Sequence, residues 1–154
     1  YEGTNGVQSQ DLIGRKTIKC GGAFIAEYIA EIRDFANSLD TDLNFIKDAT
    51  LDAATEIEAI TQFIIEQAAE NVDFPNAAAV DYLSAVGLLS FAYMFAKIAA
   101  AAKDKSGDFY QNKLALAQYF VDRILPELDS RLAKIKAGSD LIMNFSEDYF
   151  TNQA

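Results

Sequence analysis

The chain has 154 residues, of which 51% are hydrophobic, so it can form a real core and does not have the composition of a disordered segment. Its 13 Lys and Arg face 23 Asp and Glu, and the resulting net charge of −10 disfavours binding to nucleic acid or to an anionic membrane surface. The chain has no His, which is the commonest general base and metal ligand, and its one cysteine, Cys20, cannot form an internal disulfide. We therefore expect no metal site.

The first apolar pattern predicts a long amphipathic helix over residues 7–39. Its apolar side chains recur at spacings of three and four residues, which places them on one face of a helix. They are Ile25, Tyr28, Ile29, Ile32, Phe35, Ala36 and Leu39. Gly21 and Gly22 mark a weak or closely packed point inside this helix.

A second helix is predicted over residues 42–71. Its stripe is rich in isoleucine and consists of Leu43, Ile46, Ala53, Ile57, Ile60 and Ile64. The pattern ends at residues 73–76, because Pro75 cannot continue a helix and disfavours helical backbone at the residue before it. We therefore expect the third helix over residues 77–103.

A fourth helix is predicted over residues 108–137, after a polar loop. Its stripe consists of Tyr110, Leu114, Ala117, Phe120, Val121, Ile124, Leu128, Leu132 and Ile135. Pro126 lies within this pattern and should kink the helix or split it into two pieces. Residues 140–145 predict one last short helix.

The connectors between these helices are short, so neighbouring helices should pack antiparallel. The predicted fold is all-α: an up-and-down antiparallel helical bundle of about four long helices plus a short C-terminal helix.

The third helix is apolar on all sides. Residues 82–102 carry one charge, Lys97, in 21 residues. This length would span a membrane, but the stretch depends on alanine and includes Ser84 and Ser90, so we interpret it as a core or interface helix and expect no membrane span. Its aromatic side chains point around the helix, so part of its surface should face a neighbouring domain or subunit.

The opening residues Tyr-Glu-Gly-Thr allow two interpretations. Glu2 could be an ordinary exposed charge at the start of a helix. Alternatively, Gly3 lets the backbone bend sharply and approach a ligand, while Thr4 or Asn5 caps a helix whose N-terminus suits an anionic group.

The longer string YEGTNGVQSQDLIGRK resembles the segment that carries the catalytic base in the acyl-CoA dehydrogenase family of flavoenzymes. In that family a Tyr-Glu-Gly-Thr turn precedes a helix with an Ile/Val-Gln pair, here Val7-Gln8. The string GDFYQNKLALAQYFVDRILPEL (residues 107–128) resembles the helical extension appended to some bacterial members, and DLIGRK (residues 11–16) matches that extended branch.

The resemblance implies that this chain is the C-terminal piece of a larger dehydrogenase. Residues 1–40 would form the last active-site turn and the final long helix of the dehydrogenase C-terminal helical domain, and residues 41–154 the appended extension. The missing upstream part would supply most of the flavin and acyl-CoA pocket. The fragment alone is therefore expected neither to hold FAD nor to turn over.

The resemblance also assigns roles to the turn. Glu2 would remove the α-proton of an acyl-CoA thioester while hydride passes from the β-carbon to flavin N5, giving a trans-2-enoyl-CoA. Gly3 would lie beside the substrate, and Thr4, Asn5 and Gly6 would contact FAD, although many relatives have Gln where this chain has Gly6.

The implied setting is cytoplasmic and bacterial, with a homo-oligomeric enzyme and an electron-transferring flavoprotein or similar acceptor. Thioether-bearing and other short acyl-CoA compounds are among the possible substrates. The alternative hypothesis is a stand-alone, non-catalytic helical module for interaction or oligomerisation.

Overall fold

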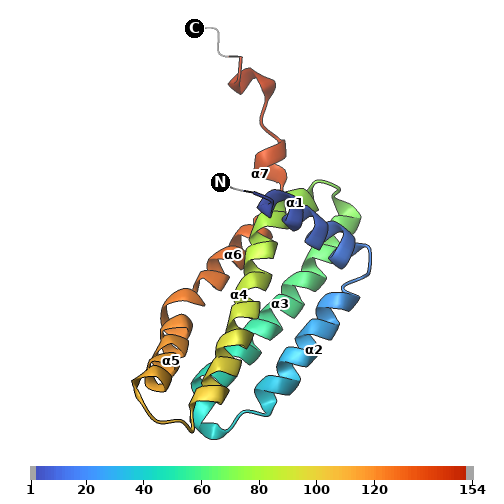
Figure 1. Ribbon diagram of the computed structural model, residues 1–154. Helices are drawn as coiled ribbons and strands as arrows, with labels where there is room; N and C mark the ends of the chain where they lie inside the picture. Colours follow the sequence, from blue (N-terminus) through green and yellow to red (C-terminus); the bar gives the residue numbers. More distant parts are fainter. Residues whose placement is uncertain (1–2, 152–154) are drawn as a thin grey trace.

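The computed structural model describes residues 3–151, and this part of the chain is helical with no strands, as predicted (Figure 1). The elements in order are α1 (Asn5–Gln10), the π-helical segment η1 (Asp11–Ile18), α2 (Ala23–Asn37), the 3₁₀ turn η2 (Thr41–Leu43), α3 (Asn44–Glu70), α4 (Phe74–Ala102), α5 (Asp108–Tyr119), the π-helical segment η3 (Phe120–Ile124), α6 (Glu127–Lys136), α7 (Asp140–Met143) and the 3₁₀ turn η4 (Glu147–Tyr149).

The up-and-down topology is confirmed. Helix α3 packs against α2 and α4, and α4 packs in turn against α5 and α6. Two contacts show that α4 runs antiparallel to the α5–α6 pair. Phe95 stacks on Phe120 with ring centroids 4.7 Å apart, whereas Asp81, earlier on α4, accepts a 2.9 Å hydrogen bond from Arg131, later on α6.

The predicted apolar stripes form the core. All six stripe residues of the predicted second helix, which lie in η2 and α3, are buried, and so are most stripe residues of α2 and α6. The core between α2, α3, α4 and α6 is dominated by isoleucine, leucine and alanine, and a smaller cluster continues it toward the α2–α3 turn. Burial of these stripes supplies the driving force that the sequence pattern indicated.

The prediction of one continuous helix over residues 7–39 is wrong, because the helix breaks at the glycine pair. Gly21 and Gly22 adopt φ values of 58° and 78°, a left-handed conformation that glycine tolerates and other residues rarely adopt. A Cβ on Gly22 would lie 3.2 Å from Ile65 Cδ1, so the chain also passes close to α3 here. The break turns α1 and η1 away from the axis of α2.

The prediction that the third helix begins at residue 77 is also wrong, because α4 begins at Phe74 and includes Pro75 in its first turn. The first amides of a helix have no intrahelical acceptor, so a proline there sacrifices no hydrogen bond. The side-chain oxygen of Asn71 accepts the Asp73 amide at 2.9 Å, and its Nδ2 donates to Ser139 Oγ at 2.9 Å. Asn71 thus joins the α3–α4 connection to the start of α7.

The expected split of the fourth helix at Pro126 is confirmed. The backbone widens into η3 just before the proline, and the Leu125 amide donates to the Phe120 carbonyl at 2.8 Å, five residues back. Because proline has no amide hydrogen and its ring clashes with the preceding turn, the helix restarts as α6 at Glu127. The short C-terminal helix is present as α7, and the chain after it extends away from the bundle (Figure 1).

Helix α4 lies at the centre of the bundle. It is the one helix among the described residues that is long and apolar enough to cross a membrane by length and composition, but half of its most apolar window is buried inside the bundle. Leu88 and Leu89 are buried as expected, whereas Phe91 and Met94 are exposed. The expectation of a buried third helix is therefore confirmed on the sides that face its neighbours and not on the remaining one.

Candidate active-site turn

The candidate site is the turn that leads into α1. Glu2, the candidate base, lies outside the described residues. Gly3, Thr4, Asn5 and Gly6 are all exposed on the surface. Thr4 occupies the N-cap position, and its carbonyl accepts the Gln8 amide at 2.8 Å. Its side chain makes no capping hydrogen bond, so Thr4 does not cap the helix in the way that the sequence suggested.

The two glycines of this turn border open space. A Cβ added to Gly3 or to Gly6 would meet no atom within 4 Å. A ligand could therefore reach the backbone of either residue without displacing any described part of this chain.

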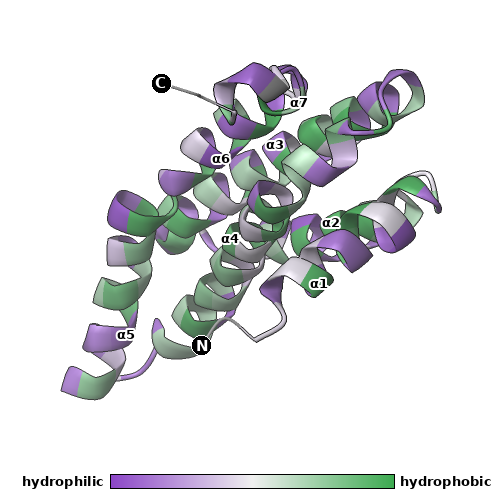
Figure 2. Cartoon of the chain, turned by 90° about the horizontal axis from the view of Figure 1, so that it is seen from above, coloured by the Kyte–Doolittle hydropathy of each residue, from purple (hydrophilic) through white to green (hydrophobic). Residues whose placement is uncertain are grey.

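The turn is held in place by the helical segment that follows it. Helix α1 packs against α4, and η1 contacts α2, α3 and α4 (Figures 1 and 2). The Ser9 hydroxyl is buried and donates to the Gly6 carbonyl at 2.8 Å, and Ile13 is fully buried in the main core. The exposed turn thus begins only a few residues from a firmly packed segment.

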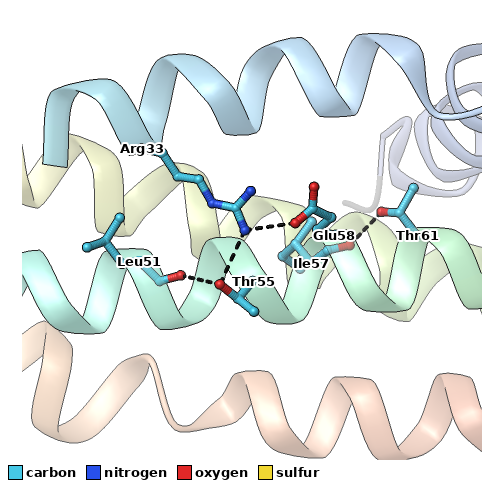
Figure 3. Close-up of polar contacts among 6 residues, drawn as sticks. All are labelled: Arg33, Leu51, Thr55, Ile57, Glu58 and Thr61. Carbon is cyan, nitrogen blue, oxygen red and sulfur yellow. Dashed lines mark hydrogen bonds and ion pairs between the residues drawn. The ribbon is translucent and has the colours of Figure 1, made fainter. Parts of the chain in front are cut away.

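A buried hydroxyl chain fixes η1 to the bundle. Thr17 Oγ1 of η1 donates to the Tyr82 hydroxyl of α4 at 3.4 Å, and the Tyr82 hydroxyl lies 2.9 Å from Thr61 Oγ1 of α3. Thr61 in turn donates to the Ile57 carbonyl at 2.6 Å (Figure 3), so Tyr82 donates to Thr61. Three elements therefore meet at one set of satisfied hydroxyl groups.

Burial raises the pKa of Tyr82, and the hydrogen bonds with Thr17 and Thr61 lower it by less. The phenol therefore remains protonated at neutral pH and keeps its role as a donor. Its environment provides no basic partner, so we assign it a positioning role: it holds the segment that carries the candidate turn.

A polar contact on the surface fixes α2 against α3. Arg33 Nη2 lies 2.8 Å from Glu58 Oε2 and 3.2 Å from Thr55 Oγ1 (Figure 3). The Glu58 side chain is more than half exposed, so this pair contributes little to the stability of the fold.

Two of the surface cavities border α3. One of about 180 Å³ lies between α2 and α3 beside Gly22, and one of about 260 Å³ lies between α3 and the η3–α6 connection. Both are lined largely by apolar side chains, together with Glu58 in the first cavity and Asp52, Glu56 and Asp129 in the second. Among the described residues, no group of three or more acidic or cysteine side chains could hold a metal ion.

Comparison with known proteins decides the family. The family described as "Acetyl-CoA dehydrogenase C-terminal like" matches residues 28–146, from α2 to the segment beyond α7. The chain belongs to the acetyl-CoA dehydrogenase C-terminal-like family. The match begins downstream of the candidate turn, so it identifies the bundle and not the turn.

Two curated relatives of this acetyl-CoA dehydrogenase C-terminal-like chain carry dehydrogenase names. The broad-specificity linear acyl-CoA dehydrogenase FadE5 of Mycobacterium tuberculosis is 29% identical over 166 aligned residues, covering 97% of this chain and 27% of the relative. The 3-methylmercaptopropionyl-CoA dehydrogenase of Ruegeria pomeroyi is 27% identical over 154 residues, covering 95% of this chain and 26% of the relative. The chain spans about a quarter of the length of these relatives.

Sequence reasoning missed the buried hydroxyl chain. The all-round apolar pattern of residues 82–102 marks Tyr82 only as one aromatic side chain of a core helix, and it does not single out Thr17 or Thr61 as its partners. One signal was present: Thr61 falls on the same helical face as Ile57, Ile60 and Ile64, and a hydroxyl among isoleucines requires a hydrogen-bonding partner.

Proposed function

We propose that this chain is the C-terminal part of an FAD-dependent acyl-CoA dehydrogenase that oxidises an acyl-CoA thioester to a trans-2-enoyl-CoA. The observation that carries the proposal is the family match over the bundle, joined to a Tyr-Glu-Gly-Thr turn at the entrance of α1. The names of the two relatives agree with this reaction class.

In this proposal Glu2 is the catalytic base. Its carboxylate would take the α-proton of the thioester, and its backbone amide would donate to the thioester oxygen, which makes that proton more acidic. A carboxylate needs a dry pocket to reach a useful pKa, because desolvation disfavours its charged form. FAD, when bound, would supply the acceptor for the hydride that leaves the β-carbon.

The neighbouring residues would shape the pocket edge. The open space beside Gly3 and Gly6 fits close approach of a planar or extended ligand to the backbone. We assign Gly3 to the substrate and Thr4, Asn5 and Gly6 to FAD. The two cavities beside α3 have volumes of only about 180 and 260 Å³ and are lined mainly by apolar side chains. The remaining walls of the flavin site would therefore come from the longer protein.

We further propose the setting that accompanies this function. Residues 1–40 would belong to the catalytic helical domain and residues 41–154 to an appended extension. The complete protein would be a cytoplasmic bacterial homo-oligomer that passes electrons to an electron-transferring flavoprotein or similar acceptor. The 154-residue chain alone would not retain FAD or be active.

A Glu2→Gln variant of the complete protein tests the proposal. The amide keeps the size of the side chain but removes the basic oxygen, so acyl-CoA should reduce the flavin about 10²–10⁴-fold more slowly while FAD remains bound. Anaerobic stopped-flow absorbance of the flavin measures the rate. Glu27→Gln, an exposed carboxylate on α2, is the matched control and should behave as the unmodified protein.

If flavin reduction keeps its rate in the Glu2→Gln variant, another residue is the base. If the complete protein holds no flavin at all, the alternative function is favoured, namely a non-catalytic helical module for interaction or oligomerisation. The exposed apolar residues Phe91 and Met94 on α4 are the observation that supports this alternative.

A further inference from the structure

Helix α4 leaves one of its faces outside the bundle. Helix α3 lies on the far side of α4, and α2 and α5 lie to either side of it (Figures 1 and 2). On the remaining face, exposed or half-buried residues recur at strictly alternating spacings of three and four. We call these residues the open face of α4: Ala77, Val80, Ser84, Gly87, Phe91, Met94, Ile98 and Ala101. Paired helices pack along stripes with this spacing, each side chain fitting between side chains of the other helix.

The open face is suited to burial. It carries no charged residue, although 23% of the residues of the chain are charged. Val80 and Phe91 are each more than half exposed, and a continuous apolar stripe of this kind normally packs against a partner. The hydroxyl of Ser84 donates to the Val80 carbonyl at 2.9 Å, so a partner could cover it without leaving a donor unsatisfied.

Gly87 is the residue of the open face that the bundle itself does not explain. A glycine in the interior of a helix destabilises the helix relative to alanine. Gly87 is not among the glycines with positive φ, and a Cβ added to it would meet no described atom within 4 Å. Neither the backbone conformation nor close packing within the described residues therefore requires glycine. The missing side chain leaves a hollow on the outer surface of α4.

The sizes of the side chains along the open face select a second copy of the chain as the partner. When two α4 helices pair in opposite directions about a point between Gly87 and Phe91, each position faces a different position of the other copy. The facing pairs are Gly87 with Phe91, Ser84 with Met94, Val80 with Ile98, and Ala77 with Ala101. The phenyl ring of each copy then enters the hollow at Gly87 of the other, and the remaining large side chains also face smaller ones. A parallel pair would instead place Phe91 against itself and leave a gap at Gly87.

We propose that two copies of this chain pair through the open faces of α4, with the two helices antiparallel. The inference needs only the residues of α4, so it does not rest on the proposed function. The contact joins the same surface on both copies, and it therefore closes as a dimer. Each copy has a net charge of −10, so added salt should strengthen the pairing. In dilute solution, where the copies separate, the contact adds nothing to the stability of the chain.

Exchanging the sizes within one facing pair tests the pairing. Gly87→Phe opposes two large side chains, so it should raise the dimer Kd of the 154-residue chain at least about 10-fold. Adding Phe91→Ala to the same chain removes the clash and should restore most of the association. Tyr119→Ala, on the exposed surface of α5, is the control and should leave the Kd unchanged. Sedimentation equilibrium at several concentrations measures the Kd, and circular dichroism checks that each variant is folded.

Three results would overturn the proposal. The first is an unmodified chain that stays monomeric at every concentration. The second is a Gly87→Phe variant that associates as tightly as the unmodified chain or more tightly. The third is a folded double variant that does not regain association, because the antiparallel pairing requires the exchange to compensate.

Disulfide trapping tests the orientation, both in the 154-residue chain and in the complete protein. Ser84→Cys and Met94→Cys are made in separate chains of different isotopic mass, each in a Cys20→Ser background, and the two are mixed under mild oxidation. Antiparallel pairing places these two positions opposite each other, whereas like positions lie about 15 Å apart along the helix axis. The mixed disulfide should therefore form at least about 10-fold faster than either like disulfide.

Like disulfides in place of mixed ones would show parallel pairing and overturn the proposal. Thiols that form disulfides in the 154-residue chain but resist both oxidation and maleimide in the complete protein would assign the open face to the rest of the polypeptide, which would also overturn it. Flavin content and acyl-CoA-dependent reduction are measured on the same preparations of the complete protein. A mixed disulfide in a protein without flavin retains the pairing and loses the proposed function, and an active enzyme without the mixed disulfide does the reverse.

Discussion

Helices α3 and α4 are neighbours of similar length, but their surfaces differ. Helix α3 buries an isoleucine stripe and exposes carboxylates such as Glu56, Glu58 and Glu66. Helix α4 buries alanines and leucines on several sides and exposes Phe91, Met94 and Ile98 on another. The comparison teaches that the sequence of a helix with clear polar and apolar faces predicts which face is buried. For a uniformly apolar helix, the neighbouring helices decide which face is buried.

The alanines explain how α4 can be central. Seven of its buried residues are alanine: Ala78, Ala79, Ala85, Ala92, Ala96, Ala99 and Ala102. Small side chains let neighbouring helices approach closely, so α4 can contact α1, α3, α5 and α6 along its length. Helix α3 has larger inward side chains and packs mainly against two neighbours.

The largest expected effect is a difference in stability between substitutions on the buried side and on the exposed side of α4. Leu89→Ala should destabilise the 154-residue chain by about 2–5 kcal/mol, because Leu89 is fully buried and its truncation leaves a cavity. Ile98→Ala, on the open face, should change stability by less than about 0.5 kcal/mol. Urea denaturation monitored by circular dichroism measures both. Similar losses would show that Ile98 is packed in the isolated chain.

A smaller effect is expected from the buried hydroxyl contact of α4 with α3 and η1. Tyr82→Phe should cost about 1 kcal/mol, because it removes the hydroxyl that joins Thr17 and Thr61 in a buried site. It should also speed amide hydrogen exchange in η1 more than in α6. Tyr28→Phe is the control, since its 3.0 Å hydrogen bond to Ser90 is only partly buried, and it should cost less. Unchanged exchange in η1 would contradict the positioning role of Tyr82.

The smallest expected effect concerns the pair that joins the turn before α3 to the end of α4. The Lys103 ammonium hydrogen-bonds the Asp40 carboxylate, which lowers the pKa of Asp40 from its ordinary value of 3.8 and raises the pKa of Lys103 from 10.5. The stabilisation is therefore present between these two ordinary values. It is lost as pH falls through the lowered pKa of Asp40 or rises through the raised pKa of Lys103.

Asp40→Asn should accordingly lower Tm slightly at pH 7, since a pair at the surface contributes little. The difference from the unmodified chain should disappear in strong acid and shrink in strong alkali, as followed by thermal denaturation at several pH values. A difference that grows toward acid would mean that Asp40 acts through another partner.

The sequence predicted the candidate turn by resemblance, and the structure shows where the residues after Glu2 lie. The sequence could not predict which contacts hold the turn in place. Ser9, Thr17 and Thr61 are polar residues whose burial depends on which helices come together, and no local pattern fixes that. The glycine pair shows a related limit, because a sequence marks Gly21 and Gly22 as a weak point but does not tell whether the helix bends, continues or breaks there.

By itself the sequence determined the all-α class, the antiparallel order of the long helices, the stripes that α2, α3 and α6 bury, and the split at Pro126. These follow from periodicity, short connectors and the missing proline amide, which all act locally. The tertiary structure alone decided that the chain turns left-handed at Gly21 and Gly22, that η1 is held to α3 and α4 through Tyr82, and that one side of α4 remains open. Those outcomes depend on contacts between residues far apart in the chain, whose free energy no local pattern contains.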